Sequence, residues 1–217
     1  MVRIEWLGHA CFFIQHEQTK IVIDPFETSS GIRYPKIDKI ADYVLVSHEH
    51  FDHNNVKAVK GSPKVIRSPV ELPEKEIKIR GISTFHDKSM GKERGKNTVY
   101  KITLDELDVV HLGDLGEIPS SEFKSKLGNA DVLLIPVGGT YTINAEEADG
   151  VVKLLSPKIV IPMHYRTEYL DFPIDNVEKF LKNKTNVKRL ETNWIEINKA
   201  ELPEEETIFV LSPPKGF

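Results

Sequence analysis

The chain has 217 residues, enough for one large domain or two small ones and for a sizeable hydrophobic core. Hydrophobic residues make up 40% of it and charged residues 29%, as in an ordinary soluble globular protein. The net charge of −4 argues against a general nucleic-acid-binding protein, which needs a strongly basic surface. The single cysteine, Cys11, excludes an internal disulfide and a metal site built from thiolates.

The sequence also indicates where the protein works and how many domains it has. No stretch is long and apolar enough to span a membrane, and the first residues do not resemble a secretion signal. We therefore expect a cytoplasmic protein without a membrane partner. No low-complexity linker and no short-period repeat divides the sequence, so we expect one domain over residues 1–217.

The first half of the chain is predicted to be mostly β-strand, because short apolar runs alternate with turn residues. Asn54 or Asn55 is a candidate cap for a short helix from Val56 to Val59, which Gly61 would end. Strands are expected at Val2–Leu7, Cys11–Gln15, Lys20–Asp24, Tyr43–Ser47, Lys64–Arg67, Ile77–Arg80, Ile82–Phe85, Thr98–Leu104 and Leu107–Leu112.

The second half is predicted to alternate strands and helices. Asn144 and Glu147 have the spacing of a capping box, so a helix should begin there and end at Ser156-Pro157. The other expected elements are a helix at Ser120–Leu127 followed by Gly128, strands at Val132–Val137 and Lys158–Met163, a helix at Asp175–Leu181, and two or three edge strands.

The most informative stretch is the hexapeptide His48-Glu49-His50-Phe51-Asp52-His53, which follows the apolar run Tyr43–Val46. In an extended chain, residues two apart point the same way, so His48 and His50 can reach one ion together. Asp52 and His53 lie slightly further on. One ion cannot easily use all four side chains, whereas two neighbouring ions can. The spacing therefore predicts a dinuclear metal site.

Three more ligand-type residues each follow a predicted strand. His86 follows Ile82–Phe85, Asp114 follows the strand that leads to Leu112-Gly113, and His164 follows the strand that ends at Met163. Strand ends are where α/β folds gather their functional side chains.

Together these residues resemble the metallo-β-lactamase superfamily of hydrolases, and the likeness extends from residue 1 to about residue 170. Three further motifs are similar to its branch of compact, mostly uncharacterised metal-dependent hydrolases, which includes ascorbate-6-phosphate lactonase. These motifs are Trp6-Leu7-Gly8-His9-Ala10, Ile23-Asp24-Pro25 and Ile161-Pro162-Met163-His164-Tyr165.

The resemblance implies a four-layer αββα sandwich in the α/β (α+β) class, with two mixed sheets flanked by helices and the site at one edge. It also implies which side chains hold the metals. The first ion would be held by His48, His50 and His86, the second by Asp52, His53 and His164, and both by Asp114. Imidazoles with carboxylates suit Zn²⁺ best, with Mn²⁺, Fe²⁺ and Ni²⁺ as alternatives, whereas calcium or magnesium sites would use oxygen ligands.

The function that follows is metal-dependent hydrolysis, in which hydroxide held between two metal ions attacks a small anionic ester, lactone or phosphodiester. Asp52 is expected to orient this nucleophile or to carry a proton. Tyr165 or Tyr141 could donate a proton to the oxyanion or the leaving group, although each tyrosine could equally be a packing residue. His9 is either a proton donor near the site or an ordinary turn histidine.

Three other features allow two interpretations each. By the resemblance, Asp24 accepts backbone hydrogen bonds from the metal-ligand loop, but it could simply form a turn before Pro25. His111 could replace His86 as a ligand, although we expect it to pack inside the protein. The loop Asp87–Lys96, which contains Arg94, is either a mobile lid that grips a phosphate or carboxylate, or a solvated hairpin loop.

Two other functions remain open. Relatives of the fold cut nucleic acids, but they usually carry an added clamp domain, for which this chain leaves little room. Di-iron relatives reduce oxygen species, but they typically have a carboxylate at or near the position of His50 and an attached flavin domain, and neither appears here. β-Lactam hydrolysis is disfavoured because no secretion signal is present. We expect a small-molecule substrate rather than a nucleic acid, and a homo-oligomer is left open.

Overall fold

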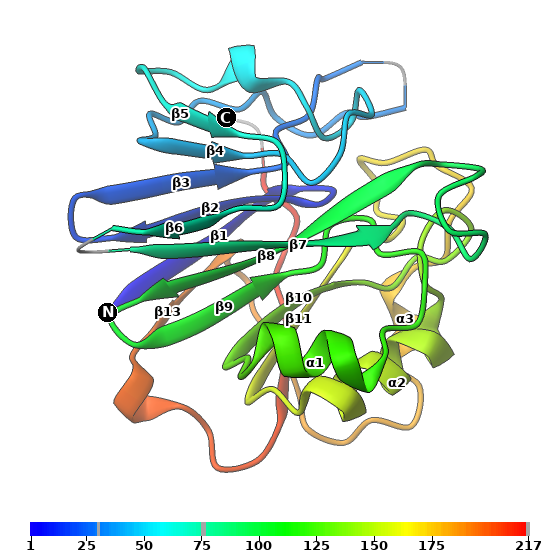
Figure 1. Cartoon of the computed structure of the whole chain (residues 1–217). Helices are drawn as coiled ribbons and strands as arrows, with labels where there is room; N and C mark the ends of the chain where they lie inside the picture. Colours follow the sequence, from blue (N-terminus) through cyan, green and yellow to red (C-terminus); the bar gives the residue numbers. More distant parts are fainter. Residues whose placement is uncertain (30, 75–76, 216–217) are drawn as a thin grey trace.

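The computed structural model describes residues 1–29, 31–74 and 77–215 and contains two mixed β-sheets (Figure 1). In the first, six-stranded sheet, β1, β2 and β3 form an antiparallel meander, and β3, β4 and β5 run parallel. The strands in spatial order are β13 (Trp194–Ile197), β1 (Val2–Gly8), β2 (Cys11–His16), β3 (Thr19–Ile23), β4 (Tyr43–Leu45) and β5 (Lys64–Ile66).

The second sheet has eight strands in the described part of the chain. Its β6–β9 half is antiparallel, and the strands from β9 to β12 are parallel neighbours. The spatial order is β12 (Val187–Arg189), β14 (Thr207–Val210), β11 (Ile159–Met163), β10 (Val132–Pro136), β9 (Leu107–His111), β8 (Lys96–Leu104), β7 (Lys78–Phe85) and β6 (Glu71–Pro73).

Among the described residues, three α-helices lie along the second sheet: α1 (Ser121–Leu127), α2 (Ala145–Leu155) and α3 (Val177–Leu181) (Figure 1). The predicted capping box of α2 is confirmed, because Asn144 Oδ1 accepts from Glu147 N at 3.0 Å and Glu147 Oε2 accepts from Asn144 N at 3.0 Å. Ser120 caps α1, and Gly128 ends it, as expected. None of the helices in the described parts of the chain is long and apolar enough to cross a membrane.

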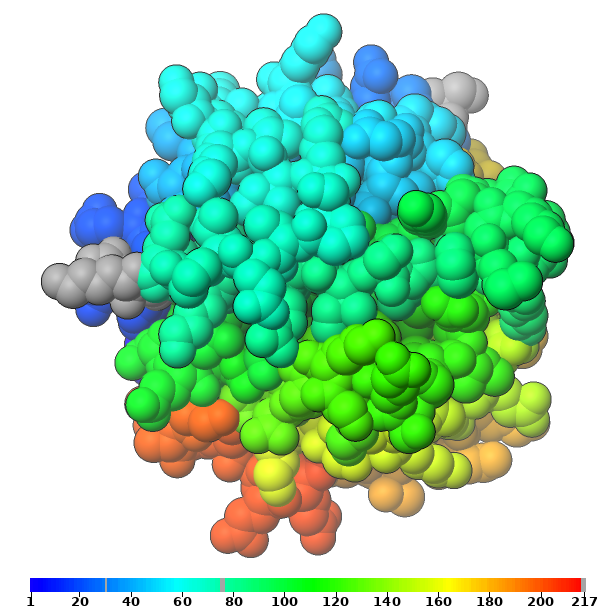
Figure 2. All heavy atoms as spheres, viewed as in Figure 1, coloured from blue at the N-terminus to red at the C-terminus, as the bar shows by residue number. Residues whose placement is uncertain are grey.

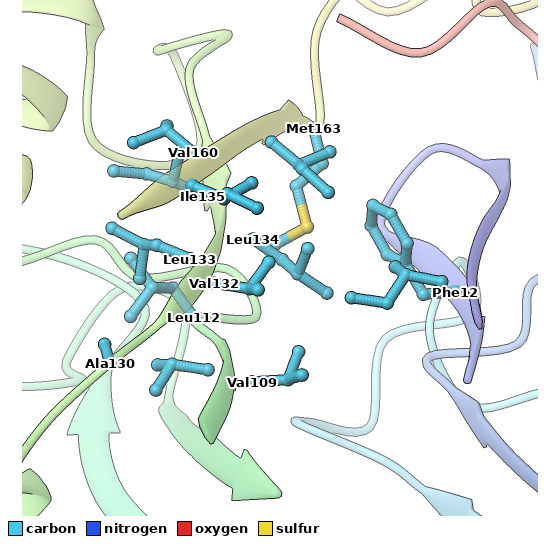
Figure 3. Packing of buried hydrophobic residues seen from close by; sticks show 14 of the residues in the cluster. Phe12, Val109, Leu112, Ala130, Val132, Leu133, Leu134, Ile135, Val160 and Met163 are labelled. Carbon is cyan, nitrogen blue, oxygen red and sulfur yellow. The ribbon is translucent and has the colours of Figure 1, made fainter. Parts of the chain in front are cut away.

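The two sheets pack against each other through one hydrophobic core. Phe12 of β2 faces Leu134 of β10 and Met163 of β11, and all three are fully buried (Figure 3). The parallel strands β10 and β11 are buried along their whole length, as continuous apolar runs predict for strands covered on both faces. The predicted sandwich of two mixed sheets is therefore confirmed.

The outer face of the first sheet is covered differently. A second apolar cluster joins its strands to buried side chains of loops, among them Phe26, Tyr34 and Leu170. The expected helix at 56–59 is a 3₁₀ turn, η1 (Val56–Ala58), and a second such turn, η2 (Lys199–Glu201), lies near the C-terminus. The Asn55 side chain does not cap η1, and its amide donates to Phe26 O at 3.2 Å.

Other differences from the sequence-based expectation arise from strand pairing. The two strands expected at Ile77–Arg80 and Ile82–Phe85 are the single strand β7, which pairs with β8 along its full length. Gly81 lies inside it, where a Cβ atom would come within 3.1 Å of Pro69 and Tyr100. β6 was not predicted, and β14 is an interior strand rather than an edge strand.

Candidate metal centre

Asp24 anchors the loop that carries the hexapeptide. It follows β3, is fully buried, and accepts hydrogen bonds from Ser47 N at 2.7 Å, Ser47 Oγ at 2.6 Å and His53 Nδ1 at 3.0 Å. Burial alone would raise the pKa of Asp24, but the hydrogen bond from His53 lowers it below the ordinary value. Asp24 also lies at a bend of the backbone, with a positive φ of 48°, and its carboxylate accepts the Ser47 N–H.

The same network orients two imidazoles. Ser47 Oγ donates to Asp24 and accepts from His48 Nδ1 at 2.9 Å, which leaves the lone pair on His48 Nε2. The bond to Asp24 does the same for His53. Sequence reasoning did not single out Ser47. The available signal was a hydroxyl residue directly before His48, the first histidine of the hexapeptide.

Asp114 lies at the centre of the cluster. Its Oδ2 is 3.2 Å from His86 Nε2 and 3.2 Å from His164 Nε2, and its Oδ1 is 3.3 Å from His53 Nε2. The sheet positions Asp114 through Asn97, a second residue that sequence reasoning missed. Asn97 Oδ1 accepts from Asp114 N at 3.0 Å, and its amide donates to Leu112 O at 2.9 Å.

The structure brings the seven expected metal ligands together, and His9 with them. Ligand atoms within 4.8 Å of one another form three groups: His48, His50 and His86; His9, Asp52, His53 and His164; and His48, His53 and Asp114. The first group has the composition expected for one ion. The second has the composition expected for the other, with His9 added.

His9 lies inside this cluster, at the turn between β1 and β2. Its ring is 4.3 Å from that of His164, and its Nε2 is 3.0 Å from Asp52 Oδ2. Burial, followed by the nearby His164, lowers the pKa of His9 to about 4, so the ring is neutral at pH 7. A neutral ring that donates Nε2–H to Asp52 holds that carboxylate in one orientation.

The charges of the cluster favour a cation. Burial lowers the pKa of His53, but Asp114 and Asp52 outweigh burial and raise it well above the ordinary value. Burial would raise the pKa of Asp114, but His164 and His53 hold it well below its usual range. Carboxylates around a buried imidazole stabilise positive charge, whether a proton or a metal ion supplies it.

Two glycines allow the backbone to pass close behind the candidate ligands from the second sheet. A Cβ atom on Gly116 would lie 2.3 Å from the carbonyl carbon of His86, and one on Gly138 would lie 2.3 Å from His164 O. His164 itself has a φ of 50°, in the left-handed region. Backbone path and ligand position are therefore coupled at both histidines.

Other expected residues lie elsewhere. Tyr165 belongs to the hydrophobic core, where its ring is 5.4 Å from that of Trp6 and burial raises its pKa. His111 is buried with both nitrogens engaged, since Nε2 donates to Ala10 O at 2.8 Å and Nδ1 accepts from Gly113 N at 3.0 Å. It packs inside the protein, as expected.

A pocket of about 370 Å³ opens over the cluster. Its walls away from the ligands are formed by Phe51, Arg94, Tyr141 and Phe172. Of the two candidate tyrosines, Tyr141 therefore lines the pocket, whereas Tyr165 is not among its lining residues. The aromatic walls come from three different loops. Strand pairing brings these loops to the same edge of the sandwich.

Comparison with known proteins identifies the family of the chain. The family model of the beta-lactamase superfamily domain matches residues 3–164. A UPF0173 metal-dependent hydrolase of Pyrococcus furiosus is 33% identical over 194 residues, covering 77% of this chain and 86% of the relative.

Solved structures show the same family and fold. A Thermotoga maritima protein, described as a candidate Zn-dependent hydrolase of the metallo-β-lactamase superfamily, is 39% identical with a TM-score of 0.81, covering 97% of this chain and 98% of that one. Igni18, a metallo hydrolase of Ignicoccus hospitalis, shares the fold at 24% identity and a TM-score of 0.64, covering 99% and 96%. The chain therefore belongs to the metallo-β-lactamase superfamily, among its UPF0173-type metal-dependent hydrolases.

Proposed function

We propose that this protein hydrolyses a small anionic ester, lactone or phosphodiester with the help of two divalent metal ions, preferably Zn²⁺. The observation that carries the proposal is the presence of two adjacent ligand groups, one of three residues and one of four because it includes His9, with Asp114 between them. His48, His50 and His86 would hold one ion, Asp52, His53 and His164 the other, and Asp114 both.

The donor atoms fit such ions. His53 Nε2 and Asp114 Oδ1 lie 3.3 Å apart, yet neither atom, nor His48 Nε2, has a hydrogen-bond partner among the described residues. Buried polar atoms are normally hydrogen-bonded, so three that lack partners in one cluster support a bound cation. Imidazole nitrogens and carboxylate oxygens suit Zn²⁺, Mn²⁺, Fe²⁺ or Ni²⁺, and zinc is the commonest choice for this donor set.

When bound, such a pair of ions supplies hydroxide at neutral pH, because it lowers the pKa of water from about 15.7 towards 7. The side chains of the protein do the rest. Asp52, held by His9, is positioned to orient the nucleophile and to take up its proton. Tyr141 lines the pocket and can donate a proton to the leaving group. Phe51 and Phe172 limit the access of water to the reacting bond.

The pocket supports a small-molecule substrate. A volume of about 370 Å³ is near the lower end of the range for ligand sites, which is about 300–1,000 Å³. A nucleic-acid strand would need a long basic groove, and the net charge of −4 does not favour one.

Metal content and hydrolysis measured on the same preparation test this proposal. We expect two divalent ions per chain by elemental analysis, and cleavage of small esters, lactones or phosphodiesters that stops with a chelator and returns with Zn²⁺. His86→Ala should bind one ion fewer and lose activity, because it removes a ligand of the first group only. The matched control is His16→Ala, whose ring contacts Met1 O instead of the cluster.

Two results would contradict the proposal. A single ion per chain in the active wild-type protein would remove the second metal position. Cleavage of single-stranded RNA without cleavage of any small ester would favour the alternative function, a nuclease or RNA-processing phosphodiesterase.

A further inference from the structure

A second cavity of about 320 Å³ adjoins the metal pocket, and His86, Arg94 and Tyr141 line both. Its remaining walls are polar and include Thr140, Thr142 and several charged side chains. A ligand that reached from the metal ions into this cavity would pass Arg94 and Tyr141. These two residues therefore decide what the far end of such a ligand can be.

The acidic side chains of the second cavity are already engaged. Asp87 accepts four backbone N–H groups of its own loop, from Ser89, Gly91, Glu93 and Arg94, at 2.8–3.1 Å. Glu147 takes part in the capping box of α2 and pairs with Lys88. Glu93 accepts from Ser89 Oγ at 2.6 Å. Of the two cations in the cavity, Lys88 is thus neutralised by Glu147.

Arg94 is the exception. Its guanidinium lies 4.5 Å from the centroid of the Tyr141 ring, and no ion pair involves it within residues 1–29, 31–74 and 77–215. Its backbone is held in place, because Arg94 N donates to Asp87 Oδ2 at 2.8 Å. The loop between β7 and β8 that carries it projects from one end of the molecule (Figures 1 and 2). Among the described residues, Arg94 thus forms no ion pair, and it lies on a loop with an ordered hydrogen-bond network.

We propose that Arg94, stacked on Tyr141, binds a carboxylate or phosphate group of the substrate that is separate from the bond being cleaved. This inference rests on the proposed function and narrows its substrate class. The substrate has two ends: a hydrolysable bond at the metal centre, and an anionic group one cavity away. The aromatic wall of Phe51 and Phe172 suits an uncharged part between the two.

The chemistry of arginine suits this role. A planar guanidinium offers two parallel N–H donors to a carboxylate or phosphate, and an aromatic ring beneath it holds the plane without consuming those donors. Lys92 lies two residues before Arg94 in the same loop and has the same charge as Arg94, but it lines neither cavity. It provides a matched control for the overall charge of the loop.

The test is a binding measurement on the zinc-loaded protein with three amides of matched length that need not be hydrolysed. Pentanamide has an uncharged end, glutaramate ends in a carboxylate, and 4-phosphonooxybutanamide ends in a phosphate. The amide end is common to all three, so a difference in Kd by calorimetry arises from the charged end. The part of that difference that Arg94→Gln removes belongs to the anion site, and any part that remains belongs to direct binding of the anion to zinc. Stronger binding of glutaramate or of the phosphate compound identifies which anion the site prefers.

We expect at least one charged amide to bind wild type about 10- to 100-fold more tightly than pentanamide, the range for a hydrogen bond to a charged group. Arg94→Gln should abolish this difference, Arg94→Lys should retain part of it, and Lys92→Gln should retain all of it. Pentanamide should bind every variant equally.

The inference is overturned if wild type binds the charged and uncharged amides equally, or if Lys92→Gln reduces the difference as much as Arg94→Gln does. These outcomes do not depend on hydrolysis. If the anion preference depends on Arg94 but no ester, lactone or phosphodiester is cleaved, the anion site stands and the proposed function fails. If esters are cleaved without any anion preference, the proposed function stands and the anion site at Arg94 is wrong.

Discussion

The two sheets hold the histidines of the proposed metal centre in different ways. On the first sheet, His48 and His53 each donate Nδ1–H to a protein partner, Ser47 Oγ or Asp24. On the second sheet, Nδ1 of His86 and of His164 is buried and has no hydrogen-bond partner in the part of the chain that is described. Their positions depend instead on a backbone that passes close to Gly116 and Gly138.

This contrast shows two solutions to one requirement. A ligand imidazole must present a defined nitrogen at a defined place, and protein partners that fix the tautomer commonly provide this. The first sheet uses a buried carboxylate that serves two histidines at once. The second sheet uses steric restriction of the backbone. Removal of a hydrogen-bonding group should therefore displace the histidines of the first sheet most. Added side-chain volume should displace the histidines of the second sheet most.

The largest expected effect is that of Asp24→Ala. The substitution leaves His53 Nδ1–H and both Ser47 donors buried without an acceptor, so we expect a loss of about 3–5 kcal/mol in the free energy of unfolding. Urea unfolding in the presence of a chelator measures this without a contribution from bound metal. Asp38→Ala, at an exposed carboxylate paired with Lys60, is the control and should change stability little. A loss as small as the control's would contradict the anchoring role of Asp24.

Gly138→Ala should have the next largest effect. Its Cβ would lie 2.3 Å from His164 O, so His164 must move, at a cost of about 1–3 kcal/mol. Elemental analysis should also show less metal per chain. Gly150→Ala, inside α2 with no atom near its Cβ, is the matched control and should stabilise the protein by up to about 1 kcal/mol. Equal behaviour of the two variants would mean that backbone packing does not position His164.

Ser47→Ala is expected to have a smaller effect, confined to one of the two groups of candidate ligands. It removes the hydroxyl between Asp24 and His48 but keeps the bond from Asp24 to His53. We expect zinc affinity at the group of His48, His50 and His86 to fall about 10-fold, measured by competition with a chelator. Affinity at the second group should stay near that of wild type, as should both affinities in Ser125→Ala on α1. A uniform loss at both groups would show that the two are not separable.

The smallest effect is expected for Tyr165→Phe. Because Tyr165 packs in the core beside Trp6, kcat for whichever small ester is cleaved should remain near wild type. A residue that acts as general acid would instead lose about 10²–10⁴-fold. Tyr141→Phe, measured in parallel, should show the larger decrease, since Tyr141 lines the pocket. A larger decrease in kcat for Tyr165→Phe than for Tyr141→Phe would instead support Tyr165 as the proton donor.

Much of this protein could be read from local sequence. The hexapeptide, His86, Asp114 and His164 are ligand-type residues at strand ends, and periodic apolar runs place strand ends at sheet edges. The cap of α2 depends on residues three apart, so it too was predictable. Such features depend on neighbours in the chain and on the chemistry of the side chain.

Other features arise from contacts between distant segments, which a single sequence does not display. Ser47 acquires its role because Asp24 and His48 meet around it, and Arg94 because Tyr141 comes from a loop nearly fifty residues later. Tyr165 lies in the core directly after His164, whose backbone is left-handed, and the Asn55 amide donates to Phe26 O, 29 residues earlier in the chain. Pairing energies across the fold override local preference at such positions, so chain chemistry predicts the ligands, whereas folding selects their supports and the walls of the pocket.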